Sequence, residues 1–240
     1  MSRVSVSPDL LRWARKRVRL PKESMLKAFP KYMEWEAGEA MPTMKQLEDF
    51  ARKTHVPFGY LFLPEPPEES LPIPDFRMVR GAVPEMPSPD LLETVETMQR
   101  RQEWMREYLI DQGQEPLPFV GAATLDESAD TVAARIRETL GLGNGWANAH
   151  NTWTDALRVL RGIIEDRGIL GVFNGVVGSN TSRPLSVEEF RGFVLVDTYA
   201  PLVFVNNRDA KSAQMFTLAH ELAHLWVGKG GGFKDRKSVV

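Results

Sequence analysis

Apolar residues recur at helical spacing through the first quarter of the chain. After Pro8, a residue suited to the first turn of a helix, an apolar stripe runs through Leu10, Leu11, Ala14 and Val18. The pattern predicts a series of short helices over residues 8–63. The first helix starts at Pro8, the second covers 22–29, and the third covers 31–37 and is stopped by Gly38. The fourth is capped by Thr43 and carries Leu47, Phe50 and Ala51 on one face, and a last turn runs from Pro57 to Leu63.

Proline then becomes frequent, which changes the expected structure. Residues 64–89 are interrupted by Pro64, Pro66, Pro67, Pro72, Pro74, Pro84, Pro87 and Pro89. Because such sequences are extended and semi-rigid, this stretch is predicted to be a linker. The sequence therefore divides into an N-terminal helical module over 1–63, a linker over 64–89 and a second domain over 90–240.

The second domain mixes helical and strand patterns. Helices are predicted over 90–111, over 126–140 with a cap near Asp126, and over 153–166. Apolar runs predict strands at 169–173, 193–196 and 202–205, the last two joined as a hairpin by residues 197–201. A final helix, capped by Asp209, is expected from Ala210 to about Val227. This order favours an α+β fold with a small antiparallel or mixed sheet and helices on one side.

The net charge and the lack of cysteine limit the partners and metal ligands that the sequence allows. The net charge is −2, so no global field favours nucleic acid, and a DNA contact would need a local basic patch. The sequence contains no cysteine, which excludes disulfides and thiolate zinc sites and leaves His, Asp, Glu or water as metal ligands. Neither a signal peptide nor a long apolar span is evident, so we expect a cytoplasmic protein.

The final helix contains the pattern His220-Glu221-Leu222-Ala223-His224. Residues four apart lie one turn apart on one helix face, so both imidazoles can reach one zinc ion at about 2.0–2.1 Å. Glu221 is offset by roughly 100° around the helix, where it can act as a general base. Zinc lowers the pKa of a bound water and polarises a carbonyl oxygen, as peptide hydrolysis requires. The pattern predicts a zinc metallopeptidase site with His220 and His224 as ligands and Glu221 as catalytic base.

The alternative is that these histidines are structural. The helix is apolar nearly all round, which predicts that it is buried, and two buried histidines with a glutamate would be costly without a metal or partner. This favours the zinc interpretation. The other two histidines, His55 and His150, are expected to be structural or solvated.

The stretch 190–226 resembles the ImmA/IrrE family of metallopeptidases. The resemblance rests on Arg191-Gly192-Phe193, Asp197-Thr198-Tyr199-Ala200-Pro201, Val205-Asn206 and the run from Ala213 to Leu225. The resemblance implies a zincin-like domain that cleaves a partner transcriptional repressor and so regulates phage, mobile-element or stress genes in prokaryotes. It also implies that His220 and His224 bind zinc and that Glu221 is the base.

One family feature has no counterpart in the sequence. Family members take a third ligand, a carboxylate, from a helix downstream of this motif, whereas Val227 to Val240 contain only Asp235 as an acid. The last residues, 235–240, match what a common sequencing adapter would encode before a stop codon. We therefore expect that residues 229–240 are a non-native tail, that the natural protein continues, and that this truncated chain is inactive.

Residues 10–63 resemble the repressor-type helix-turn-helix of xenobiotic-response-element regulators. The resemblance rests on Trp35-Glu36-Ala37-Gly38, Pro42-Thr43 and the run from Leu47 to Ala51, and the run from Pro57 to Pro67 is typical of such modules joined to ImmA/IrrE peptidases. The recognition element is shorter than in the family, so no DNA-reading residue can be assigned. A basic cluster could hold phosphates or form a solvated helix face; it consists of Arg12, Arg15, Lys16, Arg17 and Arg19.

Two functions follow from the sequence. The first is a zinc endopeptidase that cleaves a repressor, with the N-terminal module guiding it to DNA or to that repressor. The second is a DNA-binding regulator or antitoxin-like protein whose peptidase site is minor or inactive. If the first holds, the strand 202–205 either offers an edge to an extended substrate or is a buried central strand.

Overall fold

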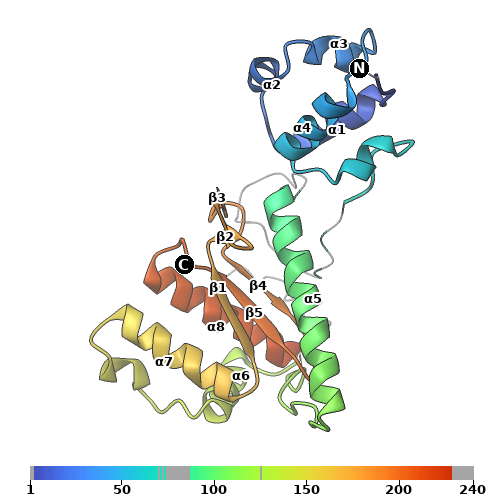
Figure 1. The fold of residues 1–240 in the computed structure, drawn as a ribbon. Helices are drawn as coiled ribbons and strands as arrows, with labels where there is room; N and C mark the ends of the chain where they lie inside the picture. The colour runs from blue at the N-terminus through green and yellow to red at the C-terminus, as the bar shows by residue number, and fades with distance from the viewer. Residues whose placement is uncertain (1–2, 70, 72, 74–86, 125, 229–240) are drawn as a thin grey trace. The chain divides into compact units, whose positions relative to one another are not determined.

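A computed structural model of the chain describes residues 3–69, 71, 73, 87–124 and 126–228 (Figure 1). The chain divides into two units, one of residues 1–70 with 85–92 and one of residues 71–84 with 93–240. Residues 70, 72 and 74–86 of the predicted linker lie outside the described residues, and so does the expected tail 229–240 with Asp235.

The first unit consists of short helices whose ends follow from local sequence. They are α1 (Pro8–Arg17), α2 (Lys22–Ala28), α3 (Tyr32–Ala37), α4 (Met44–Thr54) and the 3₁₀ helix η1 (Phe58–Phe62). Thr43 caps α4 as predicted, because its hydroxyl accepts from the Gln46 amide while the Gln46 side chain accepts from the Thr43 amide at 2.9 Å. Gly38, at a φ of 76°, ends α3 in the left-handed conformation that glycine adopts without strain.

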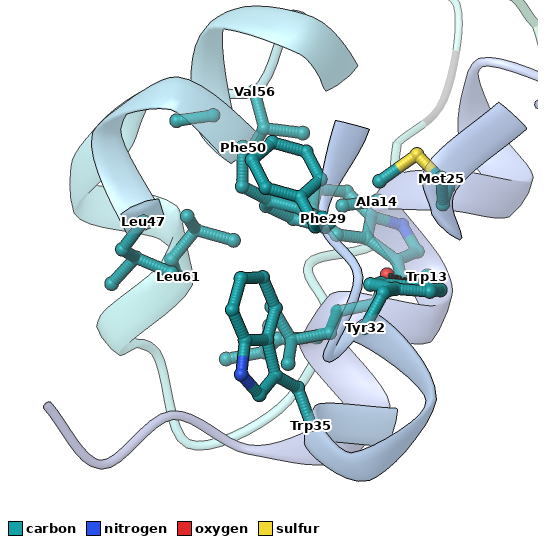
Figure 2. Close-up of a cluster of buried hydrophobic side chains, with 13 residues drawn as sticks. Trp13, Ala14, Met25, Phe29, Tyr32, Trp35, Leu47, Phe50, Val56 and Leu61 are labelled. Atoms are coloured by element: carbon teal, nitrogen blue, oxygen red, sulfur yellow. Dashed lines mark hydrogen bonds between the residues drawn. The ribbon is translucent and has the colours of Figure 1, made fainter. Parts of the chain in front are cut away.

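Aromatic side chains fill the core of this unit (Figure 2). Tyr32 and Phe50 are fully buried and stack with ring centroids 5.9 Å apart. Phe29 contacts both Phe50 and Trp35 at tilted angles. Because buried aromatic side chains contribute large apolar area, this cluster supplies the hydrophobic core that joins the short helices.

A buried ionic network lies at the edge of this core. The Glu36 carboxylate accepts a hydrogen bond from Arg15 Nε at 3.1 Å and another from the Tyr32 hydroxyl at 2.6 Å, and Lys22 Nζ lies 3.6 Å away. Burial alone would raise the pKa of Glu36, but the hydrogen bonds from Tyr32 and Arg15 and the nearby positive charges outweigh it and lower that pKa. Glu36 is therefore held ionised between α1 and α3.

The helices of the second unit are α5 (Pro89–Asp111), α6 (Ala129–Thr139), the 3₁₀ helix η2 (Trp146–Ala149), α7 (Trp153–Asp166) and α8 (Lys211–Val227); α5 belongs to this unit from Glu93 onward. The predicted cap of α6 near Asp126 is wrong. Ser128 is the N-cap, and its hydroxyl accepts from the Thr131 amide at 3.1 Å. No helix among the described residues is long and apolar enough to cross a membrane.

The sheet of this unit is mixed. Strand β5 (Leu202–Asn206) lies in the centre, parallel to β1 (Leu170–Asn174) and antiparallel to β4 (Gly192–Leu195). The α+β class and the β4–β5 hairpin are confirmed. A second, two-stranded sheet of β2 (Val176–Val177) and β3 (Asn180–Pro184) was not predicted, because β3 is mostly exposed and lacks an apolar alternation.

Helix α8 packs on this sheet beside α7 (Figure 1). Val203 and Val205 of β5 join one hydrophobic cluster with Leu218, Leu222 and Leu225 of α8. The alternate residues Leu202 and Phe204 are also buried, so both faces of β5 are covered rather than the one face expected. Near β4, Gln102 of α5 donates to the carbonyls of Leu195 and Ala200 at 2.8 and 2.9 Å.

Candidate metal centre

Helix α8 is held at its start by its own polar residues. Gln214 is buried and donates to the carbonyls of Asn207 and Asp209 at 2.9 and 2.6 Å. The predicted N-cap, Asp209, is wrong: Ala210 is the N-cap, and Asp209 Oδ1 accepts from the adjacent Ala210 amide. The side chain of Asp209 therefore lies outside the helix, and Gln214 orders the loop that leads into it.

The C-terminal end of α8 is held by a passing segment of chain. The amides of Gly121 and Ala123 donate to the carbonyls of Leu225 and Trp226 at 2.9 and 2.8 Å, and so satisfy two carbonyls that a helix end leaves without partners. The Trp226 ring stacks on Phe119 with centroids 4.6 Å apart. Both ends of the helix are thus fixed, which fixes the orientation of the side chains between them.

The two motif histidines face each other on the outer side of α8. His220 Nε2 and His224 Nε2 lie 3.1 Å apart, with ring centroids 4.8 Å apart and the ring planes at 79°. Two nitrogen ligands of a tetrahedral zinc ion, each about 2.0–2.1 Å from it, would lie about 3.3 Å from each other. The described imidazole pair therefore has the donor type and spacing that zinc needs.

Glu221, offset by roughly 100° from His220 around α8, lies on the side of the helix that faces the sheet. Its side chain is 9% exposed, and burial raises its pKa to about 8. A cation bound next to this carboxylate would counter that shift, because a nearby positive charge favours the ionised form. The carboxyl group of Glu221 is therefore shielded from bulk water.

Gly192 of β4 allows this close approach of strand and helix. A side-chain carbon at Gly192 would lie 2.5 Å from Thr217 Cγ2, 2.7 Å from the Phe204 carbonyl oxygen and 3.6 Å from Glu221 Cγ. Only glycine fits there without displacing backbone or helix. The role of Gly192 was not predicted from the sequence, although a glycine within a strand can mark a close approach of another backbone segment.

The exposed face of α8 continues beyond the histidines. Phe216, one turn before His220, is 72% exposed and lies nearly parallel to the His220 ring with centroids 6.3 Å apart. Ala219 is also exposed. The expectation that this helix is buried on all sides is therefore wrong, because one face with His220 is open while the face with Glu221 is buried.

A third protein ligand is not found among the described residues. No group of three or more His, Cys, Asp or Glu side chains in the described ranges is arranged to hold a metal ion. Asp235, the only acid after His224 in the sequence, lies outside those ranges. Of the other histidines, His55 caps α4 in the first unit, and His150 follows η2 with its ring near Trp146.

Three members of the basic cluster, Arg12, Arg15 and Arg17, form ion pairs within the first unit. Arg15 pairs with Glu36, and Arg17 donates to Glu69 at 2.6 Å and to the His55 carbonyl at 2.9 Å. Arg12 pairs with Asp9 at 2.7 Å. Arg15 and Arg17 are thus largely buried in contacts within the protein, which favours a structural role for these two side chains, whereas Arg12 belongs to an exposed surface pair.

The strand 202–205 does not offer a substrate edge. Residues of β5 pair with β1 on one side and with β4 on the other, so the interpretation as a buried central strand is correct. The edge strands of this sheet are β1 and β4. Gly192, which packs against α8, belongs to β4.

Comparison with known proteins gives one match. Residues 180–238 match the model of the IrrE N-terminal-like domain, peptidase family M78, over a segment well short of half the chain. That segment includes β4, β5 and all of α8, and it supports a metallopeptidase-family role. Members of this family are generally zinc-dependent. Searches of curated proteins and of solved structures gave no match.

Proposed function

We propose that the protein is a zinc-dependent endopeptidase that cleaves a partner transcriptional repressor. The observation that supports this most directly is the histidine pair on α8, with Nε2 atoms 3.1 Å apart, next to a buried glutamate. The family match over 180–238 covers the same helix and supports the same chemistry.

In this proposal each side chain of the motif has one role. His220 and His224 would hold the zinc ion through Nε2, and the bound ion would supply a Lewis acid for water and for the scissile carbonyl. Glu221 would accept a proton from the attacking water and pass it to the leaving amine. The fixed ends of α8 keep Glu221 and the histidines in one relative orientation, which is what positioned catalysis requires.

The third ligand remains part of the proposal. Catalytic zinc sites normally use three protein ligands, and the described residues supply two. We expect a carboxylate from outside the described residues to complete the site, as the family resemblance implies. Two histidines alone would hold zinc loosely.

The repressor as substrate is tested by co-expression. The gene, with its flanking DNA intact, is expressed together with the repressor gene beside it, and the repressor is followed on a gel. Cleavage by the wild type but not by Glu221→Gln supports the endopeptidase. An intact repressor, with DNA or a toxin bound by the protein instead, supports the alternative of a regulator or antitoxin-like protein.

A further inference from the structure

The outer face of α5 in the second unit carries two large exposed aromatic side chains. Trp104 is 62% exposed and Tyr108 is 49% exposed. They lie one turn apart and stack in parallel, with centroids 5.8 Å apart and ring planes at 7°. Exposed tryptophan and tyrosine are enriched at protein interfaces because they bury much area with little loss of rotamer freedom.

The opposite side of the same helix segment is already engaged. Gln102 binds the carbonyls of Leu195 and Ala200, and Arg106 pairs with Asp197 at 3.1 Å while its guanidinium lies 5.9 Å from the Tyr199 ring centroid. Helix α5 is therefore anchored to the β4–β5 loop through one face. Trp104 and Tyr108 project from the other.

Opposite charges flank the aromatic pair. Arg101 precedes Trp104 by three residues, and Asp111 follows Tyr108 by three, so all four share one helix face. Both charged side chains are exposed, and neither has an ion pair with another described residue. Along this face of α5 the order of side chains is therefore a positive charge, two aromatic rings and a negative charge.

This order is self-complementary. Arg101 and Asp111 lie at equal separations on either side of position 106, and so do Trp104 and Tyr108. If two copies of α5 met antiparallel with a two-fold axis at position 106, Trp104 of each copy would face the other copy's Tyr108. Each Arg101 would likewise face the other copy's Asp111. A two-fold interface requires this kind of self-complementary patch.

We propose that this face of α5, formed by Arg101, Trp104, Tyr108 and Asp111, is the interface of a symmetric antiparallel homodimer. The partner is a second copy of this chain. A nucleic acid partner is disfavoured because Asp111 sits on the same face. The patch spans about three helical turns, so the dimer belongs with small interfaces and its dissociation constant should be in the micromolar range, roughly 1–100 µM.

Sedimentation velocity over a range of concentrations tests the dimer. The wild type should shift from monomer to dimer across the micromolar range. Trp104→Ala should raise the dissociation constant about tenfold or more, as truncation of a central aromatic side chain does at interfaces. R101E and D111R should each raise it by about three- to tenfold, because each places like charges opposite one another.

A double variant and a mixture of the two single variants distinguish specific pairing from general charge effects. The double variant R101E/D111R should restore the dissociation constant to within about threefold of the wild type, because both opposite-charge pairs re-form. R101E mixed with D111R should form heterodimers more tightly than either forms homodimers. Arg158→Glu, at an exposed site of α7, is the matched control for charge and should leave association unchanged.

Circular dichroism of each variant checks that α5 remains folded. The proposal is overturned if the wild type stays monomeric at every concentration. It is also overturned if it dimerises with an affinity that Trp104→Ala and R101E leave unchanged, since another surface would then be the interface. Failure of the charge swap to rescue association would rule out the antiparallel register.

Discussion

Gly192 on β4 and Glu221 on α8 are so close that a side-chain carbon at position 192 would lie 3.6 Å from Cγ of the glutamate. The same carbon would clash with Thr217 Cγ2 and with the Phe204 carbonyl oxygen. The distance between the sheet and the proposed catalytic base is thus set by the absence of a side chain on one strand.

Gly192→Ala should therefore destabilise the second unit and displace Glu221. We expect a loss of about 1–3 kcal/mol in the free energy of unfolding, the range for overpacked cores, and a lower kcat. Urea unfolding measures the first quantity. Gly162→Ala on α7 is the control, because nothing lies within 4 Å of its added carbon, and it should leave stability equal or higher. If Gly192→Ala had the same free energy of unfolding as the wild type, β4 could move away from α8 without loss of stability, and the prediction would be wrong.

Metal binding should depend on both imidazoles. His220→Ala and His224→Ala should each lower zinc affinity by more than the roughly 10- to 100-fold that loss of a supporting contact costs at metal sites. Glu221→Gln should bind zinc like the wild type, because the proposed zinc ligands are the two imidazoles and not this carboxylate. Titration calorimetry of the apo protein measures this, with His150→Ala as the matched control. If His220→Ala bound zinc with unchanged affinity, the proposed zinc site on α8 would be wrong.

Acid should destabilise the first unit through Glu36. Folding lowers the pKa of Glu36, so the ionised carboxylate stabilises the folded state. This contribution to the free energy of unfolding is fully present above the unfolded-state pKa, near the ordinary 4.5, and is lost as pH falls through the folded-state pKa. Glu36→Gln should lose about 1–3 kcal/mol at neutral pH, since it weakens the bonds to Arg15 and Tyr32. The stability of Glu36→Gln should also change less than that of the wild type as pH falls below the unfolded-state pKa of the carboxyl group.

Thermal unfolding of wild type and Glu36→Gln from pH 7 to pH 2 measures both effects. Glu34→Gln is the matched control, since the Glu34 side chain is 45% exposed and forms a surface ion pair with Lys31. Parallel pH curves for wild type and Glu36→Gln would contradict the assignment of acid sensitivity to this carboxylate.

Some local features were predicted from the sequence, although the predicted caps near Asp126 and at Asp209 were wrong. Thr43 caps α4 as predicted; its hydrogen bonds are made with Gln46, so the whole interaction spans four residues. The spacing of His220 and His224 likewise determines that their rings share one helix face. The β4–β5 hairpin followed from two apolar runs with a short loop between them.

Long-range packing was not predictable in the same way. The parallel pairing of β1 with β5 joins residues more than thirty positions apart and leaves no local signal. Burial on α8 was predicted for the whole helix, yet the face with Phe216 and His220 is open, because composition does not reveal which side a sheet covers. The role of Gly192 depends on Thr217 and Phe204, which come close only in the fold.

Cleavage of a repressor by the protein expressed from its own gene tests the central claim most directly. The measurement is the rate at which the repressor encoded beside the gene is cut when the two are co-expressed from intact flanking DNA in zinc-replete cells. We predict two fragments with the wild type, a rate lower by about 10² to 10⁴ with Glu221→Gln, and no cleavage with His220→Ala. A repressor that stays intact with the wild type, or that Glu221→Gln cuts equally fast, would contradict the assignment of α8 as a peptidase site.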